Sequence, residues 1–202
     1  FEGPLGPDNW GERYAMCARG RNQAPINIAG PLLRVKYELV QDYRNAPLAM
    51  VNDGKTVLVA RMGGGGLAGF EAATGRYLGT LLDFVPNPRH ILISPDGRVL
   101  YASGNQSGAV GRYDLAAMLR ALAGAAGKRI DGPGGETLAV GRGARTIALS
   151  PDGRTLYVAI NNESRLVKVD LAGWRVVDRA AVDPFTVGLA VSPDGRTIVT
   201  TS

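Results

Sequence analysis

The chain has 202 residues, of which 45% are hydrophobic, and it carries a formal net charge of +5. It contains no continuous apolar run of roughly 18 residues, so we expect no membrane span. The positive charge is dispersed, and no basic run is interleaved with aromatic residues, which argues against a nucleic-acid partner. The single cysteine, Cys17, excludes an internal disulfide and a thiolate metal cluster.

Residues 1–51 are rich in glycine and proline near their start and lack strand-like alternation, so we predict a loop-rich segment. It contains the sequence GPDNWG at residues 6–11, then Cys17, then NQAPINI at residues 22–28. In these motifs the segment resembles the amino-terminal region of bacterial α-class carbonic anhydrases, with Ala24 in place of the usual serine.

That resemblance implies shared ancestry or a spliced fragment, but it does not imply catalysis. A carbonic anhydrase of this class holds zinc through three histidines, whereas this chain has one, His90. The second cysteine of the disulfide that the family implies for the position of Cys17 is also missing. We therefore expect no bound metal, no cofactor and no carbon dioxide hydration.

From residue 52 onward the sequence predicts short strands separated by turns. A first group comprises Thr56 to Ala60, Leu67 to Glu71 and Tyr77 to Leu82. The glycine-rich stretch at residues 63–69 matches GxGxxG, but a dinucleotide-binding fingerprint must open a helix and here another strand follows. We predict a hairpin loop there.

A second group of strands comprises Ile91 to Ser94, Val99 to Ser103 and Ala109 to Leu115. Apolar residues then recur at helical spacing, which predicts a helix from Asp114, as cap, to Leu122 with its apolar stripe packed on its own domain. Residues 129–135 are predicted to be a loop, and Thr137 to Val140 an outer strand.

The central repeat, residues 146–171, predicts three antiparallel strands joined by Ser150-Pro151-Asp152-Gly153 and by Asn161-Asn162-Glu163-Ser164. Arg175 to Val182 adds a fourth strand. A further pair, Val187 to Ser192 and Thr197 to Thr201, begins the next group.

The turn of the central repeat recurs along the chain, with its aspartate at positions 53, 96, 152 and 194. A period near 42 residues with several strands per unit indicates propeller blades. The sequence SPDGRTLYVAINNESRLVKVDL resembles the YVTN-type β-propeller repeat, and the resemblance covers residues 52–202. We therefore predict an all-β fold, a partial β-propeller of about four four-stranded antiparallel blades, after a first domain at residues 1–51.

Arg89 and His90 are the candidate catalytic residues. Propeller lactonases carry a similar Pro-Arg-His segment at the start of a blade, followed after the next strand by an Asn-Glu pair. Here the corresponding pair is Asn105-Gln106, while Asn162-Glu163 stands in another blade, so the pattern is divided. In non-enzymatic repeats of this type such side chains form hydrogen bonds between blades.

The repeat architecture leads us to expect a non-catalytic module that binds a protein or a small-molecule ligand. A lactonase-like hydrolase and an inactive fragment related to α-carbonic anhydrase are the alternatives. The family resemblances and the composition imply a bacterial protein that is periplasmic or secreted. Open blades expose apolar faces and unpaired strand edges, so we also expect either self-association through Val187 to Ser202 or membership of a larger ring.

Overall fold

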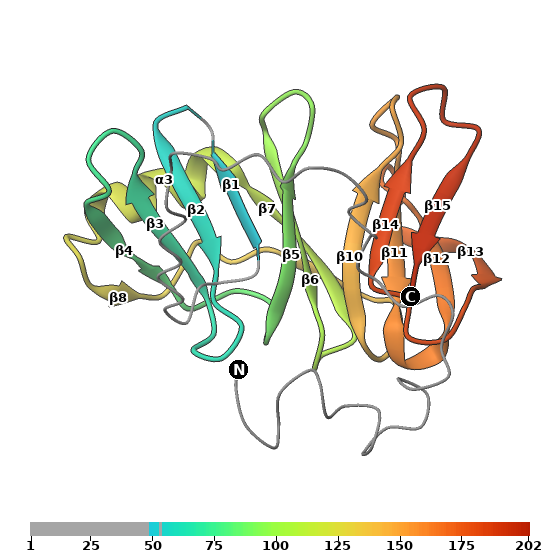
Figure 1. Cartoon of the computed structure of the whole chain (residues 1–202). Coiled ribbons are helices and arrows are strands. Elements are labelled where there is room, and N and C mark those ends of the chain that lie inside the picture. Colours follow the sequence, from blue (N-terminus) through green and yellow to red (C-terminus); the bar gives the residue numbers. More distant parts are fainter. Residues whose placement is uncertain (1–48, 53) are drawn as a thin grey trace, which may run out of the picture. The chain divides into compact units, whose positions relative to one another are not determined.

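The computed structural model of the chain describes residues 49–52 and 54–202 (Figure 1). Contacts between residues divide the chain into two units, Phe1–Asp42 and Tyr43–Ser202, and every described residue belongs to the second. Cys17 and the motifs that resemble a carbonic anhydrase therefore lie outside the described residues.

The second unit consists of four sheets whose strands follow chain order, with antiparallel pairing throughout except for one added strand. The first sheet contains β1 (Ala49–Asn52), β2 (Thr56–Ala60), β3 (Leu67–Glu71) and β4 (Tyr77–Leu81). The second contains β5 (Pro88–Ile93), β6 (Val99–Gly104), β7 (Ala109–Asp114) and β9 (Glu136–Ala139). The third contains β10 (Ala144–Leu149), β11 (Thr155–Ile160), β12 (Arg165–Asp170) and β13 (Arg175–Ala181), and the fourth contains β14 (Gly188–Val191) and β15 (Ile198–Thr201).

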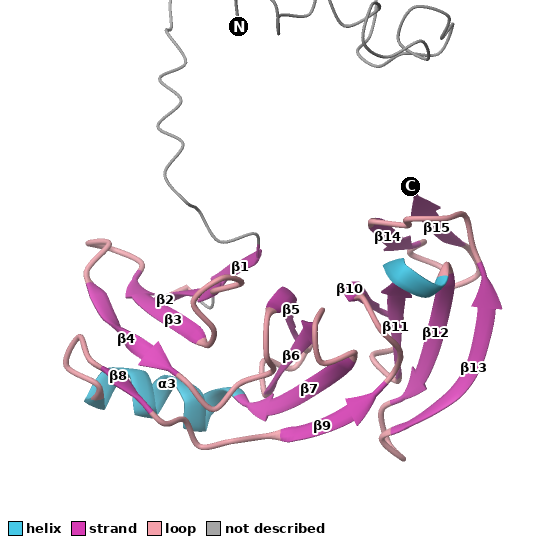
Figure 2. Ribbon diagram, turned by 90° about the horizontal axis from the view of Figure 1, so that it is seen from below, coloured by secondary structure: helices cyan, strands magenta, loops and turns pink. Residues whose placement is uncertain are grey.

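The first strands of successive sheets lie next to one another, and the later strands lie progressively outward along an arc (Figure 2). Strand β5 contacts β1 on one side and β10 on the other, and β10 also contacts β14. This is the arrangement of blades in a propeller, so the described residues form part of a propeller-like all-β fold, without a closed barrel. We call β5, β10 and β14 the inner strands.

Two strands differ from the sequence prediction. Strand β1 pairs with β2 and completes the first sheet, although its residues lie mostly in the segment assigned to the loop-rich region. Strand β8 (Arg129–Ile130) was predicted to be part of a loop, but it pairs in parallel with β4. Two residues are too few for a periodic signal, and only the return of the chain after the helix brings them beside β4.

Three of the four recurring turns form as predicted, and the fourth contains Asp53, which lies outside the described residues. In the second sheet the Oγ of Ser94 donates to Asp96 Oδ1 at 2.5 Å, and the backbone N–H of Arg98 donates to the same oxygen at 3.1 Å. The glycine that follows the aspartate has a positive φ of 71° at Gly97, and the turns at residues 150–153 and 192–195 repeat this geometry. The Ser-Pro-Asp-Gly sequence therefore sets the end of each inner strand.

The predicted helix is confirmed as α3 (Leu115–Gly124), which ends two residues beyond the prediction. Asp114 caps it by accepting a 2.7 Å hydrogen bond from the N–H of Ala117. Its apolar stripe is buried on the domain itself, as predicted, and comprises Leu115, Met118 and Leu122. A β-carbon at Gly69 in β3 would lie 2.7 Å from Leu122, so the glycine permits the close packing of helix on sheet.

Buried apolar residues form two clusters between neighbouring sheets. The first joins the first two sheets and α3, and its largest members include Leu58, Leu67, Leu81, Leu100, Met118 and Leu122. The second joins the second and third sheets, and includes Val110, Val140, Ile147, Leu156, Val158 and Ile160. The sheets are therefore held together face to face, which orders the ends of their inner strands.

Candidate functional site at the starts of the inner strands

Equivalent residues occupy the starts of β5 and β10. Pro88 pairs with Gly104 and Ala144 pairs with Ile160, so Arg89 in β5 corresponds to Arg145 in β10. In both strands the pairing register is interrupted directly after the first residue, next to the arginine. Such irregularities take a side chain out of the normal ladder alternation and redirect it.

His90 links two blades. Its Nδ1 accepts a hydrogen bond of 3.0 Å from the backbone N–H of Ile147 in β10. Its own backbone N–H donates to the Oγ of Ser103 at 3.1 Å, and that hydroxyl donates to the carbonyl of Arg145. Burial lowers the pKa of the His90 imidazole. The ring is therefore neutral at pH 7, with its proton on Nε2 because Nδ1 is the acceptor.

The position equivalent to His90 also contacts the following inner strand, but with the opposite direction of donation. Thr146 in β10 donates from its hydroxyl to the carbonyl of Val187, just before β14, whereas His90 accepts from the N–H of Ile147. Two residue types with different chemistry thus each bind the backbone of the next blade. The shared feature is a side chain that reaches the backbone of the following inner strand.

Arg89 differs from His90, because among the described residues its charge has no acidic partner. Its Nε is buried and has no hydrogen-bond partner there. Burial lowers the pKa of Arg89, and the positive charge of Arg145 lowers it further. Within residues 54–202 neither arginine forms an ion pair with an acidic side chain. In this part of the chain the charge of Arg145 therefore acts on Arg89 with no acidic side chain paired to either.

The divided Asn-Glu pattern is corrected by the structure. The N–H of Asn105 donates to the carbonyl of Asn87, and the N–H of Asn161 donates to that of Gly143, both at 3.0 Å. Asn105 therefore corresponds to Asn161, one residue earlier than the Asn-Glu pair suggests. Glu163, in the connection between β11 and β12, accepts a 2.7 Å hydrogen bond from the N–H of Arg142 between β9 and β10, so this carboxylate holds two connections together.

Sequence reasoning missed a repeated backbone feature that precedes each inner strand. Asn87, Gly143 and Phe185 all have left-handed conformations, with φ values of 52°, 84° and 60°. Their residue types share no pattern that would have predicted it, since Phe rarely adopts this region. The Phe185 side chain is also 74% exposed.

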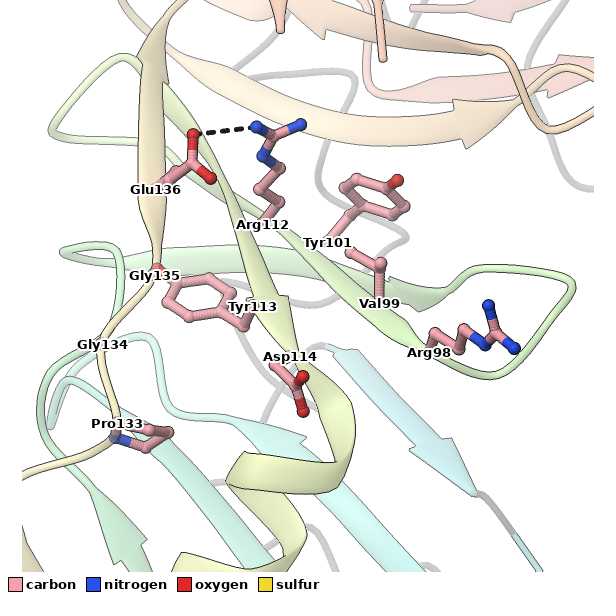
Figure 3. A pocket seen from close by; sticks show the side chains of 10 residues that line it. All are labelled: Arg98, Val99, Tyr101, Arg112, Tyr113, Asp114, Pro133, Gly134, Gly135 and Glu136. Carbon is pink, nitrogen blue, oxygen red and sulfur yellow. Dashed lines mark hydrogen bonds and ion pairs between the residues drawn. The ribbon is translucent and has the colours of Figure 1, made fainter. Parts of the chain in front are cut away.

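A second candidate is a groove of about 450 Å³ beside β7 and β9 (Figure 3). It is lined by Arg98, Val99, Tyr101, Arg112, Tyr113, Asp114, Pro133, Gly134, Gly135 and Glu136. Neither Arg89 nor His90 belongs to this lining.

The charged groups of the groove are engaged with other groups of the protein. Arg112 forms a 2.8 Å ion pair with Glu136, donates to the carbonyl of Leu171 at 3.2 Å, and lies 4.6 Å from the ring centroid of Trp174. Asp114, which also lines the groove, is the cap of α3. These contacts join β7, β9 and the third sheet. The charged groups that form them therefore have a structural role, which is to hold these elements together.

The described residues offer no metal site. In residues 49–52 and 54–202 no group of three His, Cys, Asp or Glu side chains is arranged to hold a metal ion. In the same part of the chain no helix combines the length and the apolar character that crossing a bilayer requires.

Comparison with curated proteins finds carbonic anhydrases along a short stretch. The protein from Klebsiella pneumoniae is 35% identical over 63 residues, which are 30% of this chain and 26% of that protein. Carbonic anhydrase Nec1 from Nesocodon mauritianus is 36% identical over 66 residues, covering 31% and 24%, and the Nostoc sp. carbonic anhydrase is 34% identical over 67 residues, covering 29% and 25%. The chain thus spans about a quarter of these relatives, and no protein-family model matches it.

Comparison with solved structures finds a different protein. A chain of Kuenenia stuttgartiensis hydrazine synthase is similar with a TM-score of 0.62, over 81% of this chain and 45% of that chain. The sequence identity is 23%, so this likeness concerns the fold alone.

Proposed function

We propose that this chain is a non-catalytic binding module of the YVTN-type propeller class, which takes a small-molecule or protein ligand where the inner strands begin. The observation that carries the proposal is the position of His90, the one histidine of the chain. Its Nδ1 is used as an acceptor for the next blade, and burial favours its neutral form. A side chain with this structural role does not need a reaction to explain it.

In the part of the chain that the structure describes, no acidic side chain pairs with Arg89 or Arg145, which supports binding over lactone hydrolysis. A hydrolase of the proposed lactonase-like type would use Arg89 and His90 with a carboxylate nearby, and the nearest counterpart in the pattern, Glu163, is engaged with Arg142. Binding needs only the arginine charges and the ordered loops, both of which this edge supplies.

The test compares lactone turnover by the wild-type chain and by His90→Asn. Asparagine keeps an acceptor for the Ile147 N–H but has no imidazole to exchange protons. We expect no turnover by either protein. Turnover by the wild type that disappears in a folded His90→Asn variant would refute the binding proposal and favour the hydrolase.

A carbonic-anhydrase-related fragment without activity is the second candidate, supported by the short stretch of 34–36% identity. The three histidines of such a zinc site cannot be assembled from a chain that has one. Metal analysis and a carbon dioxide hydration assay test this, and we expect neither stoichiometric zinc nor hydration. We further propose a periplasmic or secreted location, which fractionation of the source cells would test.

A further inference from the structure

We infer that Arg89 and Arg145 together bind an oxyanion, a carboxylate or a phosphate, at the starts of β5 and β10. This inference rests on the proposed binding function and specifies its ligand class. No such site was predicted from the sequence, where Arg89 was paired with His90 as a catalytic candidate.

Arg89 and Arg145 are placed as a pair. The two arginines occupy equivalent positions in neighbouring inner strands, and each lies where the strand leaves its regular register. Strands β5 and β10 contact one another directly. The third inner strand does not extend the series, since the equivalent residue before β14 is Val187. The site is therefore confined to one seam between two blades.

The charge of Arg89 has no acidic partner among the described residues. The structure keeps a buried guanidinium nitrogen of Arg89 without a partner and places a second positive charge close enough to disfavour its protonated form. Arg112, which is also partly buried, shows the usual solution, since its donors reach Glu136 and the carbonyl of Leu171. Like charges with unused donors are costly unless an anion joins them.

The guanidinium group itself indicates the class of ligand. A guanidinium presents donors in a planar fork that matches the oxygens of a carboxylate or a phosphate. Two such groups on strands that contact one another offer several donors to one compact anion. Binding neutralises the repulsion and satisfies the free donors, so a charge arrangement that weakens the free protein strengthens the complex.

Two other surface features give weaker support for a ligand site. In the groove beside β7, the side chains of Arg112, Glu136 and Asp114 already have partners within the protein, and Arg98 lies 4.0 Å from Asp96. Phe185 is exposed, but nothing in the described residues indicates what covers it. The arginine pair differs from these features because its unpaired donor and its positive charges indicate the class of ligand.

The experiment measures thermal stabilisation and calorimetric binding at constant ionic strength, with inorganic phosphate and succinate as separate probes. It compares the wild type with the double variant Arg89→Gln/Arg145→Gln. Its matched control is Arg98→Gln/Arg154→Gln, which removes the same charge at the opposite ends of β5 and β10. The phosphate and succinate arms distinguish the two kinds of oxyanion.

We expect saturable binding of at least one probe by the wild type, a loss of about tenfold or more in Arg89→Gln/Arg145→Gln, and little change in the control, since a charged hydrogen bond is worth about 1.5–3 kcal/mol. Without ligand, Arg145→Gln should raise the melting temperature, because it removes the repulsion. Binding lost only in the control would place the anion at the groove, and equal binding by all proteins would indicate a general ionic effect. Either result, or no binding by the wild type, overturns the inference of an oxyanion site. The proposed binding function is refuted by a different result, namely lactone turnover that depends on His90.

Discussion

The Nδ1 atom of His90 accepts a hydrogen bond of 3.0 Å from the backbone N–H of Ile147, across the seam between two neighbouring blades. Ile147 is almost fully buried, so this N–H has little access to water as an alternative partner. The contact explains why an imidazole stands at the start of β5 without any reference to catalysis. Substitutions of His90 can therefore test whether this residue has a structural or a catalytic role.

We predict that His90→Ala lowers the free energy of unfolding by about 1–3 kcal/mol, because it leaves the Ile147 N–H without an acceptor. His90→Asn should lose less, since the amide oxygen can accept the same bond. Denaturant unfolding of the three proteins measures the difference. Equal losses in both variants would show that the ring packing, and not the hydrogen bond, matters.

The pH dependence of stability should carry the signature of His90. Its folded pKa lies below the ordinary value of 6.5, so the unfolded state binds the proton more readily. The contribution of His90 is therefore fully present above about pH 6.5 and declines as the pH falls through the folded pKa. The free energy of unfolding, measured across this pH range, should change more steeply with pH for the wild type than for His90→Asn. Parallel curves for the two proteins would contradict the lowered pKa of His90.

Tyr113 gives a second titration at the alkaline end. Burial raises its pKa to about 12, and its hydroxyl accepts a 2.8 Å hydrogen bond from the N–H of Val85. Because the folded pKa exceeds the unfolded value of 10.0, the stability it contributes is full below pH 10 and is lost as the pH rises toward 12. Burial also raises the pKa of Tyr101, so ultraviolet titration should show late ionisation of more than one tyrosine, and the part that belongs to Tyr113 should be absent in Tyr113→Phe.

The same substitution tests the hydrogen bond itself. Tyr113→Phe leaves the buried N–H of Val85 without its acceptor and should lower stability by about 1–3 kcal/mol at neutral pH. The ring stacks on Phe84 at 4.6 Å and is retained in the variant, so apolar packing is nearly unchanged. Stability equal to the wild type would mean that water replaces the hydroxyl.

Helix α3 should be anchored by its buried face. Leu122 is fully buried and meets the sheet at Gly69, so Leu122→Ala should cost about 2–5 kcal/mol. Arg120→Ala, on the exposed face of the same helix, is the matched control and should change stability little. Gly69→Ala should also destabilise, because its β-carbon would clash with Leu122. Thermal unfolding measures these changes in stability. If Leu122→Ala and Gly69→Ala are both as stable as the wild type, α3 contributes little to the stability of the fold.

The last sheet makes self-association the expected behaviour of the isolated chain. It has two strands in the described residues, and Val199 in β15 is 55% exposed. Among the described residues β15 pairs with β14 alone, and a strand edge that carries exposed apolar residues is prone to pair with another chain. Light scattering should show mass that rises with concentration, and Val199→Lys should reduce this rise. A monomer at all concentrations would contradict the prediction.

The sequence alone determined the local elements, because their signals lie within a few residues. Ser-Pro-Asp-Gly specifies its turn through the aspartate bonds and the positive φ of the glycine, and the spacing of the turns predicts the succession of sheets. The cap at Asp114 and the helical spacing of Leu115, Met118 and Leu122 likewise suffice to locate α3.

Only the tertiary structure decided the contacts between distant segments. His90 and Ile147 are 57 positions apart, and no local pattern connects them. The pairing of β8 with β4 and the approach of Arg145 to Arg89 depend on how whole sheets pack, since each brings together residues that are remote along the chain. Turn chemistry is short in range and can be inferred from sequence, whereas the charge environment of the candidate site arises only when two blades meet.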